Sequence, residues 1–306
     1  MTKTKLGYLL LLALALIAPF VAYPVFLMKA LCFALFACAF NLLLGFTGLL
    51  SFGHAAFFGT GGYIVGHCVK ELGLPPELGL IAGALAAAGL GYLIGSLAIR
   101  RQGIYFAMIT LALSQLVYFF YLQAPFTGGE DGLQPVPRGK LFGVIDLEND
   151  LNFYYVVLAV FLFGFWLIYR TIHSPFGQIL KSIRENEPRA ISLGYDVDKY
   201  KLLAFVISCG LAGLAGSTKT LALHLASLTD VTWQASGEVV LMTLLGGLGT
   251  VFGPIVGAFV VVGLQNYLAS YGSWVTVIMG VIFVTCVLAF RRGIVGEIQA
   301  KLSRTP

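Results

Sequence analysis

Long stretches without a charged side chain constrain this chain more than any other feature of its sequence. Its 19 Lys and Arg and 14 Asp and Glu make up only 11% of the 306 residues, whereas about a quarter of a soluble domain is charged. The uncharged stretches are 6–28, 30–69, 78–99, 102–129, 151–169, 202–218 and 239–290. A helix needs about 20 residues to cross a bilayer, so nearly every stretch can supply a crossing. The sequence therefore predicts an all-α polytopic membrane protein and excludes a soluble enzyme, a nucleic-acid-binding domain and a disordered chain.

The positions of the basic residues predict the orientation of these crossings. Counting crossings from a cytoplasmic N-terminus places 14 of the 19 basic residues inside and leaves Lys29, Lys70, Arg138, Lys140 and Lys219 outside. The inverted topology would contradict the positive-inside bias. The first apolar stretch is longer than a signal-peptide core, so we expect an uncleaved helix. We expect eight to ten crossings, ten being favoured, in one transmembrane domain over 1–306 with both termini in the cytoplasm.

Two glycine-rich stretches, one in each half of the chain, are expected to interrupt membrane helices. Residues 246–254 read GGLGTVFGP, and residues 41–54 contain three glycines among apolar residues. Glycine relaxes the backbone and proline removes a hydrogen-bond donor. Irregular backbone at membrane depth persists only where it is buried in protein or lines a watery cavity. Two such stretches are typical of a transporter's central pathway, and close helix packing at glycines is the alternative.

Two polar segments separate the apolar stretches. The outer one, 124–151, has the Gly-Gly and Asp-Gly steps of turns and an acidic surface that could meet a soluble partner. The inner one, 170–201, predicts a helix capped by Ser174 with Pro175 in its first turn, and a second short helix that ends at Gly194. Each segment is either a docking surface or a simple connector.

Several kinds of chemistry find little support in the sequence. The five cysteines form no C-x-x-C motif or Cys/His cluster, so we expect no metal site and no cofactor. No G-x-x-x-x-G-K-[ST] motif is present, so energy from ATP would have to arrive through a partner.

Two rival functions depend on a few residues each. An ion-coupled secondary transporter would bury charges in mid-span, but only Lys219 and Glu238 are candidates, and both are expected near segment ends, where Lys can snorkel. An intramembrane hydrolase would pair Ser51 with His54 as nucleophile and base, although the sequence offers no evident third group to orient them.

Several motifs occur in one order over about 30–295, and together they resemble one family. They are residues 45–59 (GFTGLLSFGHAAFFG), 101–110 (RQGIYFAMIT), 127–133, 174–177 (SPFG), 183–194, 201–205 and 246–254. In these motifs the chain resembles LivM-type permeases, the membrane subunits of branched-chain amino acid ABC importers. Permeases for urea also look alike, so urea or short amides remain alternative substrates.

The resemblance implies a non-enzymatic permease in the bacterial cytoplasmic (inner) membrane. It implies a second, LivH-type permease subunit, two cytoplasmic ATPases and an external or periplasmic amino-acid-binding protein as partners. The ATPase contact would involve Arg184, Glu185, Asn186, Glu187, Arg189, Ala190 and Gly194. The binding protein would dock at Thr127, Gly128, Gly129 and Asp131.

Polar side chains inside apolar segments are the candidates for the substrate pathway. They are Asn41, Thr47, Ser51 and His54, with Thr110, Ser114 and Gln115 behind them. Hydrogen bonding between helices is the alternative role for these groups. Because this expected pathway has no charge in mid-span, it offers a zwitterion little to hold, and we expect affinity to reside mainly in the external binding protein.

Overall fold

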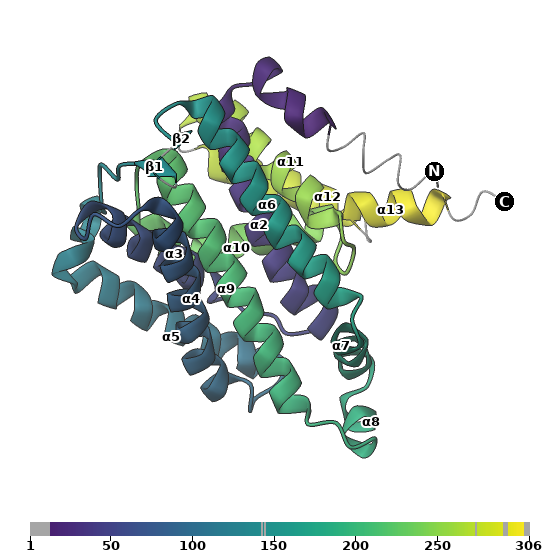
Figure 1. Ribbon diagram of the computed structural model, residues 1–306. Coiled ribbons are helices and arrows are strands. Elements are labelled where there is room, and N and C mark those ends of the chain that lie inside the picture. Colours follow the sequence, from purple (N-terminus) through teal and green to yellow (C-terminus); the bar gives the residue numbers. More distant parts are fainter. Residues whose placement is uncertain (1–12, 142, 144, 273, 290–292, 303–306) are drawn as a thin grey trace.

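The protein is a bundle of helices with almost no β-structure, as the sequence predicts. The computed structural model describes residues 13–302 except 142, 144, 273 and 290–292. Within that part, the strands β1 (Lys140–Leu141) and β2 (Ile145–Asp146) form one antiparallel pair. This pair lies at one end of the bundle, and the short helices α7 (Pro175–Glu185) and α8 (Glu187–Ser192) lie at the other, as Figure 1 shows.

Five of the described helices are long and apolar enough to cross a membrane. They are α2 (Pro24–Thr47), α4 (Pro76–Ala98), α5 (Ile104–Gln123), α6 (Asp150–Ile172) and α9 (Val197–Leu223). The two most buried of the five are α2 and α9, which pack against each other in the centre of the bundle. The three others each expose an apolar face, which suits contact with lipid or with another membrane subunit.

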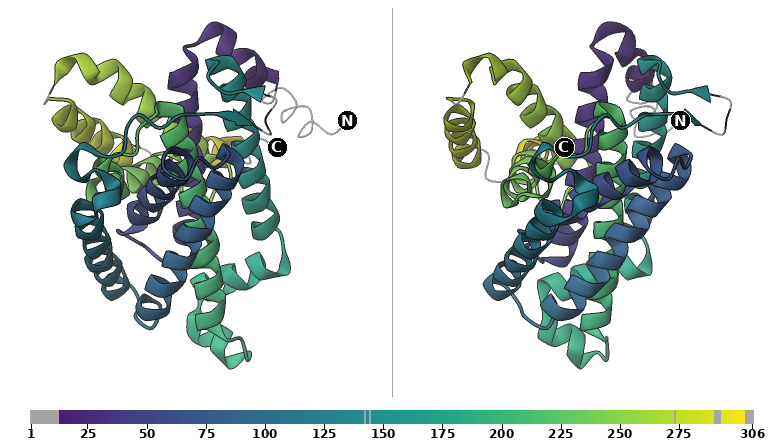
Figure 2. Two further views of the ribbon diagram at one scale, coloured as in Figure 1. Left: turned by 60° about the vertical axis from the view of Figure 1, so that its left-hand side comes forward. Right: turned by 90° about the vertical axis from the view of Figure 1, so that its left-hand side faces the viewer.

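A shorter helix follows the first glycine-rich stretch, and the second lies among shorter helices. These helices are α3 (His54–Lys70), α10 (Trp233–Gly246), α11 (Gly253–Leu268) and α12 (Trp274–Ala289), and α13 (Gly293–Leu302) follows. With 17 and 14 residues, α3 and α10 are shorter than the roughly 20 residues of a typical crossing. Figure 2 shows α10, α11 and α12 gathered on one side of α2. The expectation of a glycine-interrupted helix in each half is therefore confirmed.

Three expected boundaries differ from those observed. Residues 13–21 are helical, and α2 begins at Pro24, whose fixed φ suits the first turn of a helix, so Lys29 lies inside α2 instead of between two crossings. The first interruption covers only 48–53, because the helix continues through Thr47 before Gly48 ends it with φ +80°. At the other end, α6 and α9 extend into the inner polar segment and shorten it to 173–196.

The remaining described elements are four short 3₁₀ helices. They are η1 (Pro125–Thr127), η2 (Gly129–Asp131), η3 (Leu228–Val231) and η4 (Ala269–Tyr271). The first two belong to the connection between α5 and α6, and η3 joins α9 to α10. The beginning of the expected first crossing, 1–12, and the basic residues at 291 and 292 lie outside the described residues.

Faces of small residues allow α3, α4 and α9 to approach each other closely. A Cβ atom on Gly83 of α4 would lie 2.2 Å from Ser217 Oγ and 2.8 Å from the carbonyl oxygen of Gly61. A Cβ atom on Gly216 of α9 would lie only 1.8 Å from the carbonyl oxygen of Phe58. Small residues are the usual means of tight helix packing in lipid, where no hydrophobic effect draws helices together. The small-residue faces of α4 and α9 therefore pack within this subunit.

Replacement of Gly216 by alanine should destabilise the protein by about 1–3 kcal/mol, because a methyl group would force the backbones of α3 and α9 apart. Gly89→Ala is the matched control, since nothing lies within 4 Å of a Cβ there. We expect thermal unfolding in detergent to show a lower midpoint for Gly216→Ala and an unchanged or raised midpoint for Gly89→Ala. Equal midpoints for both variants would contradict the close approach.

Candidate functional site

The first interruption leads from one end of the bundle to its middle. Residues 48–53 follow α2, and α3 then begins at His54. His54 Nε2 lies 3.0 Å from the hydroxyl of Ser208, which is near the centre of α9 and donates a hydrogen bond to Ala39 O of α2. These contacts place the N-terminus of α3 well inside the bundle.

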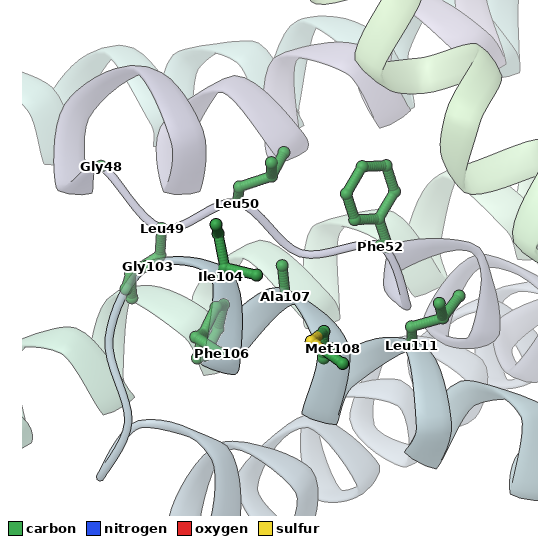
Figure 3. A pocket seen from close by; sticks show the side chains of 10 residues that line it. All are labelled: Gly48, Leu49, Leu50, Phe52, Gly103, Ile104, Phe106, Ala107, Met108 and Leu111. Atoms are coloured by element: carbon green, nitrogen blue, oxygen red, sulfur yellow. The ribbon is translucent and has the colours of Figure 1, made fainter.

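An apolar, half-open cavity of about 430 Å³ adjoins this interruption, and two of its lining residues, Ile104 and Met108, are largely exposed. Figure 3 shows residues 48–52 running beside the first turns of α5. The lining residues are Gly48, Leu49, Leu50, Phe52, Gly103, Ile104, Phe106, Ala107, Met108 and Leu111. None of these ten residues has a polar side chain, so the cavity suits an apolar group of a small molecule.

None of the predicted pathway residues lines this cavity. Asn41, Thr47, Ser51, His54, Thr110 and Ser114 are buried, and Gln115 is half-buried. Gly53 brings the first interruption against α5, since a Cβ there would lie 2.3 Å from Thr110 O and 3.0 Å from Ser114 Cβ. The hydroxyls of Thr110 and Ser114 donate to carbonyls of their own helix. A role for these residues in the pathway stays a prediction.

His54 occupies an aromatic environment. Its ring lies against Phe36, Phe40, Phe57 and Phe205. Among the described residues, neither His54 Nδ1 nor the Ser51 hydroxyl has a hydrogen-bond partner, and the two residues do not bond to each other. The arrangement gives no support to a Ser51–His54 nucleophile and base.

The second interruption is fastened to α2 by Asn41. The side-chain amide of Asn41 donates to Thr250 O at 2.9 Å, and its carbonyl oxygen accepts from Gly249 N at 3.1 Å. The Thr250 hydroxyl also bonds within the turn, donating to Gly247 O and accepting from Gly253 N. Backbone groups released between α10 and α11 thus find partners inside the bundle. Asn41 serves to join α2 to this turn.

The inner polar segment has the two short helices that the sequence predicts. Ser174 caps α7 by accepting from Gly177 N, and Asn186 caps α8 by accepting from Arg189 N. Their buried apolar face includes Ile183 and Ala190. Asp196 caps α9 at the end of the segment, and the hydrogen bond from Lys199 lowers the pKa of the Asp196 carboxyl.

Arg184 connects α7 to both interruptions. Its guanidinium donates to the carbonyl of Gly45, in the last turn of α2. A Cβ on Gly48 would lie 3.2 Å from Arg184 Cγ, and a Cβ on Gly249 would lie 3.2 Å from Arg184 Nη1. The last carbonyls of a helix lack partners within it and carry partial negative charge, which favours a cation there. A displacement of α7 would therefore act on both glycine-rich stretches.

Glu187 fastens α8 in a similar way. Its carboxylate is 2.7 Å from Lys201 Nζ on α9 and accepts from Gln102 Nε2 at 2.8 Å. Arg184 and Glu187 are thus engaged within the chain. Of the other residues expected at the ATPase contact, Ala190 is buried, and Glu185, Asn186, Arg189 and Gly194 are exposed.

Sequence reasoning overlooked two exposed apolar side chains beside these residues. Ile191 and Leu193 are 57% and 67% exposed at the end of α8. The sequence signal that could have identified them is the presence of apolar residues in a polar segment outside the bundle. An exposed apolar pair among charged residues is typical of a surface that binds another protein.

Comparison with known proteins agrees with this architecture. Residues 24–288 match the family described as "Branched-chain amino acid transport system / permease component". The chain belongs to this family.

Individual relatives show the range of the family. The permease is 26% identical to the high-affinity branched-chain amino acid transport system permease protein LivM of Escherichia coli strain K12, over 98% of this chain and 77% of the relative. It is 26% identical to a probable LivM of Methanocaldococcus jannaschii, over 67% of this chain and 60% of the relative. It is also 28% identical to the ribose import permease RbsC of Bacillus subtilis, over 54% of this chain and 51% of the relative. No solved structure matches the chain.

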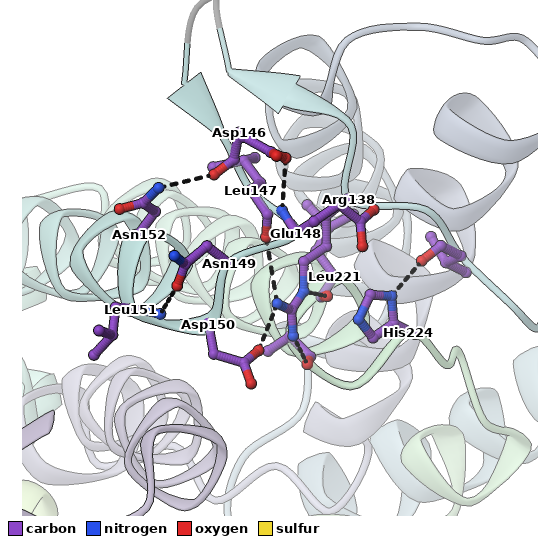
Figure 4. A network of polar contacts seen from close by, with 12 residues as sticks. Arg138, Asp146, Leu147, Glu148, Asn149, Asp150, Leu151, Asn152, Leu221 and His224 are labelled. Atoms are coloured by element: carbon purple, nitrogen blue, oxygen red, sulfur yellow. Dashed lines mark hydrogen bonds and ion pairs between the residues drawn. The ribbon is translucent and has the colours of Figure 1, made fainter.

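In this permease, a buried arginine, Arg138, holds the connection between α5 and α6. The sequence analysis counted Arg138 only as a basic residue outside the membrane. Arg138 is 2% exposed and donates to the carbonyls of Leu221 and Ala222 at the end of α9. It also forms an ion pair of 2.7 Å with Asp150 at the start of α6 and lies 4.7 Å from the ring centroid of Phe153. Figure 4 shows this network, which fixes the connection onto two helices.

The residues expected to meet a binding protein lie in the same connection. The Thr127 side chain is buried and donates to carbonyls at the end of α5, so its role is local. Gly128 and Asp131 are exposed, and Gly129 is half-buried. Their docking role stays a prediction.

Arg138→Met should loosen this connection and lower the free energy of unfolding by about 3 kcal/mol, because carbonyls at the end of α9 lose a charged donor. We expect faster limited proteolysis within 124–149 in the purified permease. Lys140→Met, which alters an exposed cation of the same connection, is the control and should leave the cleavage rate unchanged. Equal cleavage rates in both variants would contradict the anchoring role of Arg138.

Proposed function

We propose that this permease is one of two membrane subunits of an ATP-driven importer for branched-chain or related hydrophobic amino acids, in the bacterial cytoplasmic (inner) membrane. The match to branched-chain amino acid transport permeases over most of the chain carries the importer class, and the apolar cavity beside the first interruption carries the substrate class. The branched-chain amino acid relatives that span most of the chain support the same substrate class.

The lining of the cavity favours this substrate class over others. A site for a sugar, for urea or for a short amide needs hydrogen-bonding groups, because a buried polar group without a partner is strongly disfavoured. The ten lining residues offer apolar side chains instead. An aliphatic side chain fits this surface, although other relatives are named as import permeases for ribose and fructose. The predicted pathway residues, from Asn41 to Gln115, are part of the proposal as the polar surroundings of the cavity.

Each end of the bundle would bind a different partner of the importer. At the α7–α8 end, the exposed Ile191, Leu193, Glu185 and Arg189 would meet one of two cytoplasmic ATPases. Arg184 would then pass the motion of α7 to α2 and to the turn after α10. The connection held by Arg138 would dock the external binding protein, and a similar second permease would complete the membrane part.

Filling the cavity tests the proposed function. Ala107→Trp should abolish most leucine uptake while the complex still assembles, because the indole would occupy the space available to the substrate. Ala159→Trp, on the exposed face of α6, is the matched control and should transport normally. Uptake is measured in proteoliposomes that contain the binding protein and ATP. Undiminished uptake by Ala107→Trp would exclude the cavity from the pathway.

Two kinds of change should separate ATPase docking from coupling. Ile191→Glu combined with Leu193→Glu should reduce co-purification of the ATPase, because charges would replace an apolar contact. Arg184→Gln should retain the ATPase but weaken the stimulation of ATP hydrolysis by loaded binding protein, since it removes the cation between α7 and the C-terminus of α2. If both variants give wild-type values, the segment that contains α7 and α8 serves only as a connector.

A further inference from the structure

A buried ion pair lies within the bundle where the sequence led us to expect a snorkelling lysine. Lys219 on α9 contacts both carboxylate oxygens of Asp230 on η3, at 2.6 and 2.5 Å. The side chains are only 8% and 13% exposed. Lys219 is therefore paired inside the protein.

Two more charged groups lie close to this pair. Lys29 lies on α2 and Glu238 on α10, and α10 packs against both α2 and η3, which brings the two charges within electrostatic reach of the pair and of each other. Gln265 on α11 hydrogen-bonds Glu238, whereas Lys29 has no hydrogen bond or ion pair to a described residue. We call Lys29, Lys219, Asp230 and Glu238 the charged cluster.

Stability does not account for the buried Lys219–Asp230 pair of the charged cluster, and Lys29 and Glu238 beside it are half-buried. Removing charges from water costs several kcal/mol per ion, and a well-packed apolar replacement of a buried pair is often neutral or stabilising. Ionisable side chains within a membrane bundle mark a substrate or ion site as a first hypothesis. The charged cluster carries both signs, which a site for a simple cation or anion does not need.

The charged cluster is connected to the first interruption through α3. A Cβ on Gly59 would lie 2.3 Å from Val231 Cγ2 and 3.2 Å from Asp230 O, so η3 is seated directly against α3. One turn earlier, Ala55 N donates to the hydroxyl of Ser236 on α10. Phe52, which lines the apolar cavity, lies two residues before the start of α3. The charged cluster and the segment that lines the cavity are thus linked through the first turns of α3.

We propose that the charged cluster binds the ammonium and carboxylate groups of a zwitterionic amino acid before its side chain reaches the apolar cavity. The inference rests on the proposed function. Lys29 would take the carboxylate, and Glu238, together with Asp230, would take the ammonium group. The lining of the cavity can accept an aliphatic side chain but has no charge for either end of the molecule. The charged cluster provides the groups that an uncharged pathway lacks.

Trp233 offers a direct readout of binding. It lies three residues after Asp230, and the other two tryptophans, Trp166 and Trp274, can be replaced by phenylalanine. The assembled importer, without its binding protein, is titrated in nanodiscs with leucine. We expect a saturable change in Trp233 fluorescence. No saturable change is expected with 4-methylpentanoate, which lacks the ammonium group, or with 3-methylbutylamine, which lacks the carboxylate.

Variants test which charges take part. Glu238→Gln should raise the half-saturating leucine concentration about tenfold or more, because a neutral amide cannot replace a carboxylate opposite an ammonium group. Lys219→Met with Asp230→Asn removes the pair without leaving a buried unpaired charge, and it should also weaken the response. Lys140→Met and Asp146→Asn change the same residue types on exposed positions of the β1–β2 hairpin and should leave the response unchanged.

The outcomes separate this inference from the proposed function. A missing leucine response, an equal response to the two monopolar analogues, or an unaltered half-saturation in Glu238→Gln would each overturn the binding role, even if leucine uptake by the complete importer is normal. A complete importer that takes up no branched-chain amino acid would instead overturn the proposed function.

Discussion

Pairing the backbone groups of broken helices is the constraint on which this structure depends. An intact membrane helix satisfies its own N–H and C=O groups, but an interruption releases several of them where water is scarce. Here the partners come from other elements. Asn41 binds two adjacent residues in the turn after α10, Ser236 accepts from the first turn of α3, and Arg184 donates to the last turn of α2. Each interruption is thereby fastened to a neighbour, so irregular backbone connects elements instead of separating them.

This fastening explains how one short helix outside the bundle can influence its centre. Arg184 reaches the end of α2, and the same turn of α2 lies beside Gly249, where Asn41 holds the second interruption. From there, α10 continues back to Ser236 and to the first turn of α3. The path consists of short rigid helices joined by hydrogen bonds, and such elements pass on displacement better than flexible loops.

The sequence predicts what depends on composition and local pattern, and it fails where distant residues meet. The apolar stretches, both interruptions and the cap at Ser174 follow from local rules, and the structure confirms them. The pairing of Lys219 was missed because a single lysine near a segment end gives no sign of Asp230, which follows on another element. Arg138 was overlooked for the same reason, since the carbonyls it binds lie more than eighty residues away.

The two central helices show one further principle of the architecture. Because α2 and α9 run in opposite directions, their C-termini lie at opposite ends of the bundle, and each presents carbonyls without helical partners. An arginine from a connecting segment binds each one, Arg184 at α2 and Arg138 at α9. These two segments are also the ones that we expect to meet the ATPase and the binding protein. A force applied by either partner would thus reach the two most buried of the five long apolar helices through a guanidinium group at a helix C-terminus, where the macrodipole strengthens the contact.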